Sequence, residues 1–132
     1  MMYSDSSRFL RFALLADATI SGAVGVLMLA GAGLLDGLLG LPAGLLRGAG
    51  LVLVPYVAAL VWLARRDDVP RQAVWAVIAA NGLWALACVL LLLSGLIAPT
   101  WLGVGFVLVQ AVTVLVFAEL QYMALRRPYA VA

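Results

Sequence analysis

Apolar residues run along the chain in four long stretches, separated by short groups of charged residues, glycine and proline. The stretches extend from about Phe12 to Leu35, Ala43 to Ala64, Gln72 to Ile97 and Trp101 to Leu125. A helix that crosses a bilayer needs about 20 mainly apolar residues, and backbone polar groups cannot stay unpaired in lipid. The pattern therefore predicts an all-α polytopic membrane protein, with four transmembrane helices in one bundle and a single transmembrane domain over residues 1–132.

The composition excludes a water-soluble domain. Hydrophobic residues make up 67% of the 132 residues, and charged residues only 11%. A soluble globular chain is about 45–50% apolar and about 25% charged, so this chain has too few polar side chains to cover a surface that faces water. The lipid bilayer is therefore the first partner that the sequence predicts. Nucleic acid is not expected as a partner, because the positive charges flank the membrane spans.

The arginines predict which side of the membrane each end occupies. All eight positive charges are arginines, and only Arg47 lies away from the flanks of the chain ends and of the link between the second and third spans. Positively charged short flanks stay in the cytoplasm. Both termini are therefore predicted to be cytoplasmic (N-in, C-in), with residues 36–42 and 98–100 outside. Arginine without lysine, together with abundant Ala, Gly, Leu and Val, is typical of GC-rich bacterial genomes, so we expect a bacterial inner (cytoplasmic) membrane.

The end of the second span is similar to the end of the fourth. The segment "YVAALVWLARR" (56–66) can be aligned with "FAELQYMALRR" (117–127), and the first and third spans can be aligned so that Asp17 matches Asn81. The alignment suggests two helical hairpins of the same orientation, related by an axis along the membrane normal. Two helices that end in a double arginine at one membrane face also look alike without a common origin, so the sequence leaves both explanations open.

Each span places one polar group in the cytoplasmic half of the membrane. Asp17 lies about 8–9 Å from the Arg11 end of its helix, at a rise of about 1.5 Å per residue, and Tyr56, Asn81 and Glu119 lie at similar depths in the other spans. A carboxylate in a bilayer is costly unless it is paired, hydrated or protonated. We therefore expect Asp17 to face the bundle interior, where it hydrogen-bonds Asn81 or Tyr56 or takes up a proton.

Helical periodicity extends this polar layer. Ser21 shares the face of Asp17, and Trp84 shares the face of Asn81. The candidate ligand-binding residues are therefore Asp17, Ser21, Tyr56, Asn81, Trp84 and Glu119. Glu119 has an alternative role, an ion pair with Arg126 along its own helix. A separate polar stripe on the fourth span is rotated away from Glu119, and we expect it to face a partner subunit: Gln110, Thr113 and Gln121.

Two functions from different classes fit these features. The first is an intramembrane site around Asp17 that binds or transports a small molecule, a proton or a lipid. The second is a non-catalytic accessory or scaffold subunit of a membrane complex, in which the polar layer fixes the packing. A homo-oligomer or a membrane-complex partner is expected in either case, because a bundle of only four helices leaves little room for a cavity.

An enzyme is not expected. Histidine is absent, the single cysteine, Cys88, lies in an apolar segment, and no nucleophile has a neighbouring base. The same absence of ligating side chains predicts no metal site and no cofactor.

Three segments carry a resemblance to known proteins: "RFALLADATISG", "LLGLPAGLLRG" and "FAELQYMALRR". With the hydropathy of the whole chain, they resemble the small four-helix proteins of bacterial inner membranes, including the DoxX-like group. The resemblance implies a four-helix membrane bundle and assigns no functional residue, because it includes no catalytic motif. The polar or cysteine motifs of four-helix fluoride channels and of quinone-coupled thiol oxidoreductases are missing.

Overall fold

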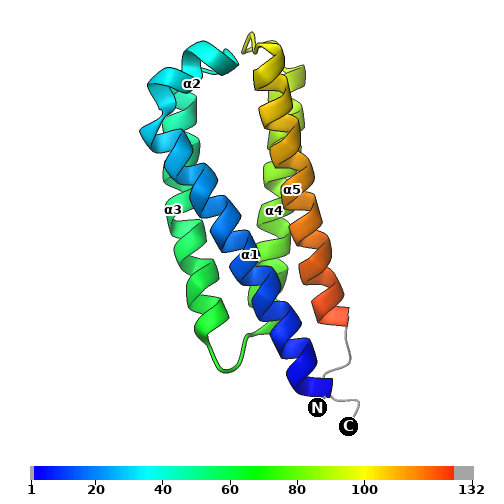
Figure 1. Cartoon of the computed structure of the whole chain (residues 1–132). Coiled ribbons are helices and arrows are strands. Elements are labelled where there is room, and N and C mark those ends of the chain that lie inside the picture. The colour runs from blue at the N-terminus through cyan, green and yellow to red at the C-terminus, as the bar shows by residue number, and fades with distance from the viewer. Residues whose placement is uncertain (1, 127–132) are drawn as a thin grey trace.

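The computed structural model describes residues 2–126, with side chains from residue 8 onward. All regular structure in this part of the chain is helical (Figure 1). The five helices are α1 (Met2–Ala30), α2 (Ala32–Leu39), α3 (Ala43–Arg65), α4 (Arg71–Leu93) and α5 (Trp101–Arg126). Arg127, which contributes to the predicted orientation, lies outside the described residues.

Four of the described helices, α1, α3, α4 and α5, are long and apolar enough to cross a membrane. Large apolar side chains, among them Trp62 and Leu86, are exposed on their outer faces, as expected for helices that lipid surrounds. The predicted all-α bundle of four transmembrane helices is thus confirmed, and these helices indicate a multi-pass membrane protein.

The third span ends earlier than the sequence predicts. α4 stops at Leu93 rather than near Ile97. The hydroxyl of Ser94 donates to the carbonyl of Leu91 at 2.8 Å, and Gly95 has a φ of 76°, in the left-handed region that glycine reaches at little cost. The local conformation of these two residues therefore ends the helix inside an apolar stretch.

A short helix that the sequence does not predict, α2, covers one end of the bundle. The chain bends at Gly31 between α1 and α2, and α2 occupies part of the predicted loop 36–42. Gly40 ends α2 with a φ of 68° in the left-handed region. Thr100 donates its backbone N–H to the carbonyl of Leu39 at 2.9 Å, which fastens α2 to the start of α5.

The four long helices form two antiparallel hairpins. α1 packs along α3, and α4 packs along α5. The hairpins meet mainly where α1 contacts α5, whereas the backbones of α3 and α4 lie farther apart. Figure 1 shows the two pairs close together near the chain ends and separated toward α2. The predicted arrangement of two hairpins is therefore present in the fold.

Burial follows the same pattern in both hairpins. In the register that aligns Asp17 with Asn81, four buried positions of α1 coincide with the four buried positions of α4. They are Leu10, Ala13, Asp17 and Ser21 in α1, and Val74, Val77, Asn81 and Ala85 in α4. α3 and α5 correspond in the register that aligns Tyr56 with Phe117, where Leu46, Gly50, Leu60, Leu63 and Ala64 match Val107, Ala111, Gln121, Ala124 and Leu125.

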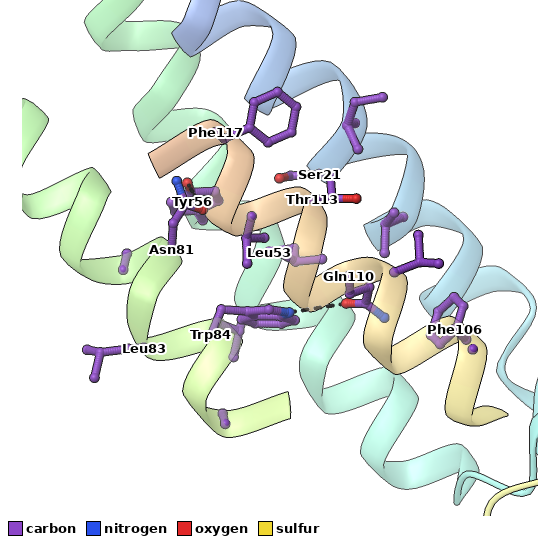
Figure 2. A pocket seen from close by; sticks show the side chains of 18 of the residues that line it. Ser21, Leu53, Tyr56, Asn81, Leu83, Trp84, Phe106, Gln110, Thr113 and Phe117 are labelled. Carbon is purple, nitrogen blue, oxygen red and sulfur yellow. Dashed lines mark hydrogen bonds between the residues drawn. The ribbon is translucent and has the colours of Figure 1, made fainter. Parts of the chain in front are cut away.

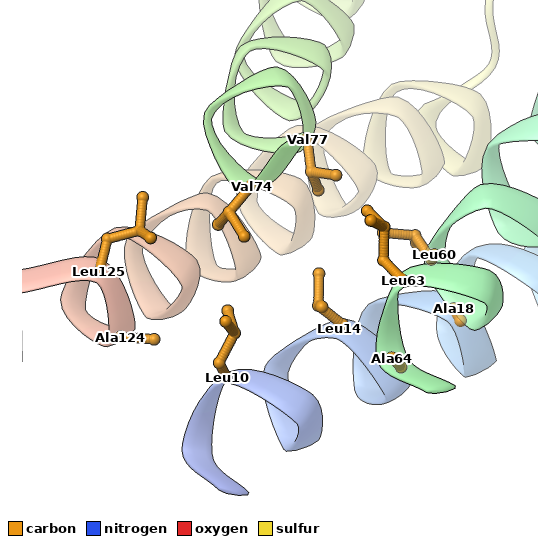
Figure 3. Close-up of a cluster of buried hydrophobic side chains, with 10 residues drawn as sticks. All are labelled: Leu10, Leu14, Ala18, Leu60, Leu63, Ala64, Val74, Val77, Ala124 and Leu125. Carbon is orange, nitrogen blue, oxygen red and sulfur yellow. The ribbon is translucent and has the colours of Figure 1, made fainter. Parts of the chain in front are cut away.

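Two apolar clusters fill the interior, one near each end. The cluster at the end with the chain termini draws on all four long helices and includes Leu10, Leu14, Leu60, Val74 and Leu125 (Figure 3). The cluster under α2 includes Met28, Leu39, Leu46, Leu53 and Val107. The polar residues of the interior lie between these two clusters, so the first cluster closes the bundle on the side of the termini.

Candidate ligand-binding site

Asp17 lies at the centre of a buried group of polar side chains. Its side chain has 0% exposed surface, and both carboxylate oxygens accept hydrogen bonds. Ser21 donates to Oδ1 at 2.9 Å. Tyr56 donates its hydroxyl to Oδ2 at 2.7 Å, and the amide nitrogens of Asn81 and Gln121 donate to the same oxygen at 3.0 and 2.9 Å. These five residues are called the polar cluster below.

The polar cluster connects all four membrane-spanning helices. Asp17 and Ser21 belong to α1, Tyr56 to α3, Asn81 to α4 and Gln121 to α5. Asn81 also donates to the side-chain carbonyl of Gln121 at 3.1 Å. Every donor to the carboxylate is uncharged, so the charge of an ionised Asp17 would be met by dipoles and not by a cation. Such bonds are needed because an unpaired charge at this depth is strongly destabilising.

The local helical geometry explains why these side chains meet. Ser21 follows Asp17 by four residues and therefore lies on the same face of α1, one turn away. Ala18, which follows Asp17 in the chain, is also buried. Its side chain is small enough to let neighbouring helices approach. On the side of the termini the apolar cluster around Leu14 and Leu60 separates the polar cluster from that end of the bundle.

Four of the predicted ligand-binding residues come together as the sequence indicates: Asp17, Ser21, Tyr56 and Asn81. The expected hydrogen bonds from Tyr56 and Asn81 to Asp17 are both present. The other two predicted residues do not join the polar cluster: Trp84 lines the cleft described below, and Glu119 is exposed on the outside of α5. The residue of α5 that joins the polar cluster is Gln121.

The prediction that Gln121 faces a partner subunit is wrong. Gln121 has 0% exposed surface and bonds to Asp17 and Asn81. The stripe of Gln110, Thr113 and Gln121 does share one face of α5, but this face turns toward the interior of the bundle. Gln110 and Thr113 are half-buried and line a cleft next to the polar cluster.

The cleft has a volume of about 740 Å³ and lies between the two hairpins, on the α2 side of the polar cluster. Ser21, Tyr56 and Asn81 form its floor; Asp17 does not line it, because these three residues lie in front of the carboxylate. Figure 2 shows Tyr56 and Asn81 near one another, with Trp84 and Gln110 further along the cleft. The walls are mainly apolar, and include Val52, Leu53, Leu83, Phe106, Val109 and Phe117.

The cleft opens to the outside of the bundle at membrane depth. Leu83 and Val109, on its walls, are each 65% exposed. A single chain thus forms a cavity, which contradicts the expectation that four helices leave too little room and removes that argument for an oligomer.

No protein-family model, curated protein or solved structure matches the chain, so the resemblance to DoxX-like proteins stays a prediction.

Two polar groups that line the cleft are left with hydrogen-bonding capacity. Trp84 donates its indole N–H to the side-chain carbonyl of Gln110 at 3.1 Å, which fixes the orientation of that amide. Among the described residues, neither the amide nitrogen of Gln110 nor the hydroxyl of Thr113 donates a hydrogen bond. An unused donor inside an apolar environment is costly, so both groups are available to a ligand that accepts hydrogen bonds.

A second cavity, of about 400 Å³, lies next to the first, beside the apolar cluster under α2. Trp84, Phe106 and Gln110 line both cavities, so the Trp84–Gln110 pair stands between them. Cys88 lines the second cavity and is half-buried. The walls of this cavity are otherwise apolar, and the polar cluster does not contribute to it.

Proposed function

We propose that the protein binds a neutral amphiphile from the membrane in the 740 Å³ cleft. The observation that carries the proposal is the combination of apolar walls open to lipid with a floor of uncharged polar groups. The volume of the cleft lies within the range of about 300–1,000 Å³ that is typical of small-molecule sites. The ligand's apolar chain would lie along the walls, and its head group would reach Gln110, Thr113 and the floor.

The membrane environment explains why the polar floor decides what binds. Lipid tails are as apolar as the cleft walls, so transfer of an alkyl chain from lipid into the cleft gains little. Hydrogen bonds to the head group must therefore supply the preference for one ligand over bulk lipid. The unused donors of Gln110 and Thr113 fit a head group that accepts hydrogen bonds, such as a hydroxyl, carbonyl or ether oxygen.

The charge of the site favours a neutral head group. No arginine among the described residues lines the cleft, so an anionic head group would lack a counter-ion. Asp17, the one buried carboxylate from residue 8 to 126, bonds to Ser21, Tyr56 and Asn81 and is not accessible for an ion pair with a cationic head group. Burying either kind of charge would be costly.

The alternative role as a scaffold subunit is weakened, because its proposed contact surface includes a residue that is fully buried, Gln121. Its partner-facing stripe was Gln110, Thr113 and Gln121, and these residues line the cleft or lie in the polar cluster. A scaffold would need no occupant in the cleft, so a binding experiment separates the two functions.

Fluorescence quenching tests the proposed ligand class. The chain has four tryptophans, and substitution of Trp62, Trp75 and Trp101 by Phe leaves Trp84 in the cleft wall as the only emitter. This variant is placed in nanodiscs and titrated with dibrominated oleyl alcohol, whose bromines quench tryptophan on contact. We expect saturable quenching, and weaker binding of dibrominated oleic acid at a pH that keeps it ionised.

A pair of glycine variants controls for quenching by bulk lipid. A Cβ atom added at Gly105, which lines the cleft, or at Gly82, which does not, would meet no neighbouring atom within 4 Å, so both positions can begin a larger side chain. Gly105→Phe should fill the cleft and abolish saturable quenching, whereas Gly82→Phe should preserve it. Quenching that rises without saturation, and equally in both variants, would overturn the proposed binding function and favour the scaffold.

A further inference from the structure

Three oxygen atoms of the polar cluster lie in a row. The hydroxyl of Tyr56 is 2.7 Å from Oδ2 of Asp17 and 2.9 Å from Oδ1 of Asn81. Both distances are those of hydrogen bonds, and each such contact needs one hydrogen atom. The phenol carries only one, so with an ionised Asp17 one of the two contacts has no hydrogen.

The neighbouring amides cannot supply the missing hydrogen. Both hydrogens of the Asn81 amide nitrogen are used, one toward Asp17 and one toward the side-chain carbonyl of Gln121. Turning the Asn81 amide over would place its oxygen against the oxygens of both Asp17 and Gln121. The observed orientation therefore satisfies the most groups, and the row of three oxygens remains one hydrogen short.

One added proton completes the row without any movement of heavy atoms. A proton taken from the aqueous phase and bound to Oδ2 of Asp17 can be donated to the Tyr56 oxygen. The Tyr56 hydroxyl then donates to Oδ1 of Asn81, and both contacts hold a hydrogen. Uptake also removes a negative charge from a side chain that is fully buried, where a charge without a cation is costly.

The groups that face Asp17 include no charge that would oppose this uptake. Ser21 faces it from α1, Tyr56 from α3, Asn81 from α4 and Gln121 from α5. Of these only Tyr56 is titratable, and it acts here as a neutral phenol. Arg11 is held at the end of the bundle, where it donates to the carbonyl of Arg66 at 2.7 Å, and Glu119 is exposed on the outside of α5.

We propose that the polar cluster is a proton-binding site, and that a neutral amphiphile in the cleft binds together with one proton at Asp17. The second part rests on the proposed function. Ser21, Tyr56 and Asn81 belong to both the polar cluster and the cleft floor. When a ligand oxygen accepts a hydrogen bond from the hydroxyl of Ser21 or Tyr56, the carboxylate of Asp17 loses that donor. The Asp17 carboxylate then favours its protonated form. Binding therefore becomes tighter as the pH falls.

Infrared spectroscopy tests the proton site without any ligand. The wild-type protein in nanodiscs is titrated with acid, and the carbonyl stretch of a protonated, buried carboxyl group is recorded. We expect one such band that Asp17→Asn removes and that the matched control Glu119→Gln retains. Should Asp17→Asn fail to fold, Tyr56→Phe identifies the band, because loss of the phenol acceptor moves the stretch to higher frequency. Absence of any band that responds to these variants would overturn the proton site.

The pH dependence of binding tests the coupling. With one proton taken up per ligand, the affinity of dibrominated oleyl alcohol for the Trp84-only protein should fall by up to about tenfold per unit rise in pH. The same variant with Asp17→Asn should show no such slope. Saturable binding with a flat pH profile would overturn the coupling but leave the proposed binding function intact. Failure of all saturable binding would overturn the binding function and with it the coupling, while the infrared band would still report on the proton site.

Discussion

The side-chain amide of Gln121 in α5 donates a hydrogen bond of 2.9 Å to the carboxylate of Asp17 in α1, across 104 positions of the chain. This bond joins the two hairpins at the place where they are in contact, and Asn81 and Tyr56 connect to the same carboxylate from α4 and α3. Together with the apolar cluster on the side of the termini, which also draws on all four long helices, the polar cluster attaches the two hairpins below the cleft.

Replacement of Gln121 by glutamate should make stability strongly dependent on pH. Gln121→Glu places a second carboxylate against Asp17, and an uncompensated buried charge costs on the order of 3 kcal/mol. At neutral pH we expect this loss of unfolding free energy. At mildly acidic pH one carboxyl group holds a proton and donates it to the other, so stability should return as the pH falls. Unfolding in detergent micelles at the two pH values measures the effect.

The control for this variant is an exposed residue of the same helix. Glu119→Gln removes a carboxylate from the outside of α5 and should change stability by no more than about 0.5 kcal/mol. A Gln121→Glu protein as stable as the wild type at neutral pH would contradict the contacts of the polar cluster.

Two nearby glycines of α5 should respond in opposite ways to alanine. A Cβ at Gly103 would collide with the backbone carbonyl of Leu39 in α2, whereas a Cβ at Gly105 would meet no atom. Gly103→Ala should therefore destabilise the protein by about 1–3 kcal/mol. Gly105→Ala should be neutral or stabilising by up to about 1 kcal/mol, because alanine is the better helix former. Thermal unfolding compares the two, and equal effects would argue against the close packing of α2 on α5.

The unused hydroxyl of Thr113 should contribute to affinity, and its removal should leave stability unchanged or slightly raised. Thr113→Val keeps the shape of the side chain and removes the hydroxyl, so a lost hydrogen bond to the ligand, worth about 1 kcal/mol, should weaken binding of dibrominated oleyl alcohol about fivefold. Thr19→Val is the matched control, because Thr19 is exposed and donates to the carbonyl of Leu15 at 2.8 Å. Equal affinities for both variants would place the head group elsewhere.

The arginine distribution predicts that both termini lie in the cytoplasm. Green fluorescent protein fused after residue 132 should fluoresce, since it folds on the cytoplasmic side. Alkaline phosphatase inserted in the predicted outer loop, residues 98–100, should be active, because the enzyme becomes active only on the outer side of the membrane. The opposite pair of results would reverse the orientation of the bundle.

The four membrane spans could be predicted from the sequence because an apolar stretch of about 20 residues is typical of a helix that crosses a membrane. The ends of α3 and α5 could be predicted to within one residue, whereas the ends of α1 and α4 near α2 could not, because they depend on the conformation of particular residues. Gly31 and Gly95 interrupt the helical path, but the chain has 13 glycines and others, such as Gly82, lie within helices. Which glycine bends is decided by contacts such as those of α2 with the start of α5, which the sequence pattern does not reveal.

The polar cluster was partly predictable for a similar reason. The depth of Asp17, Tyr56 and Asn81 in their spans brings them together, and the cost of a carboxylate in lipid turns Asp17 inward. α5 offered two polar candidates, Glu119 and Gln121, and its apolar residues are spread over all of its faces. Such a helix has little periodicity to mark its inner face, so only packing against α1 shows that Gln121 faces Asp17.

Photoaffinity labelling tests most directly whether the cleft is a binding site for a neutral amphiphile. The wild-type protein in nanodiscs is irradiated with oleyl alcohol that carries a diazirine in its chain, and the labelled residues are located by mass spectrometry. We predict labels concentrated on cleft residues that face away from bulk lipid, such as Leu53, Trp84 and Phe106, suppressed by excess oleyl alcohol and by Gly105→Phe but not by Gly82→Phe. Labels spread evenly over outward residues such as Trp62 and Leu86, insensitive to competitor, would contradict the account.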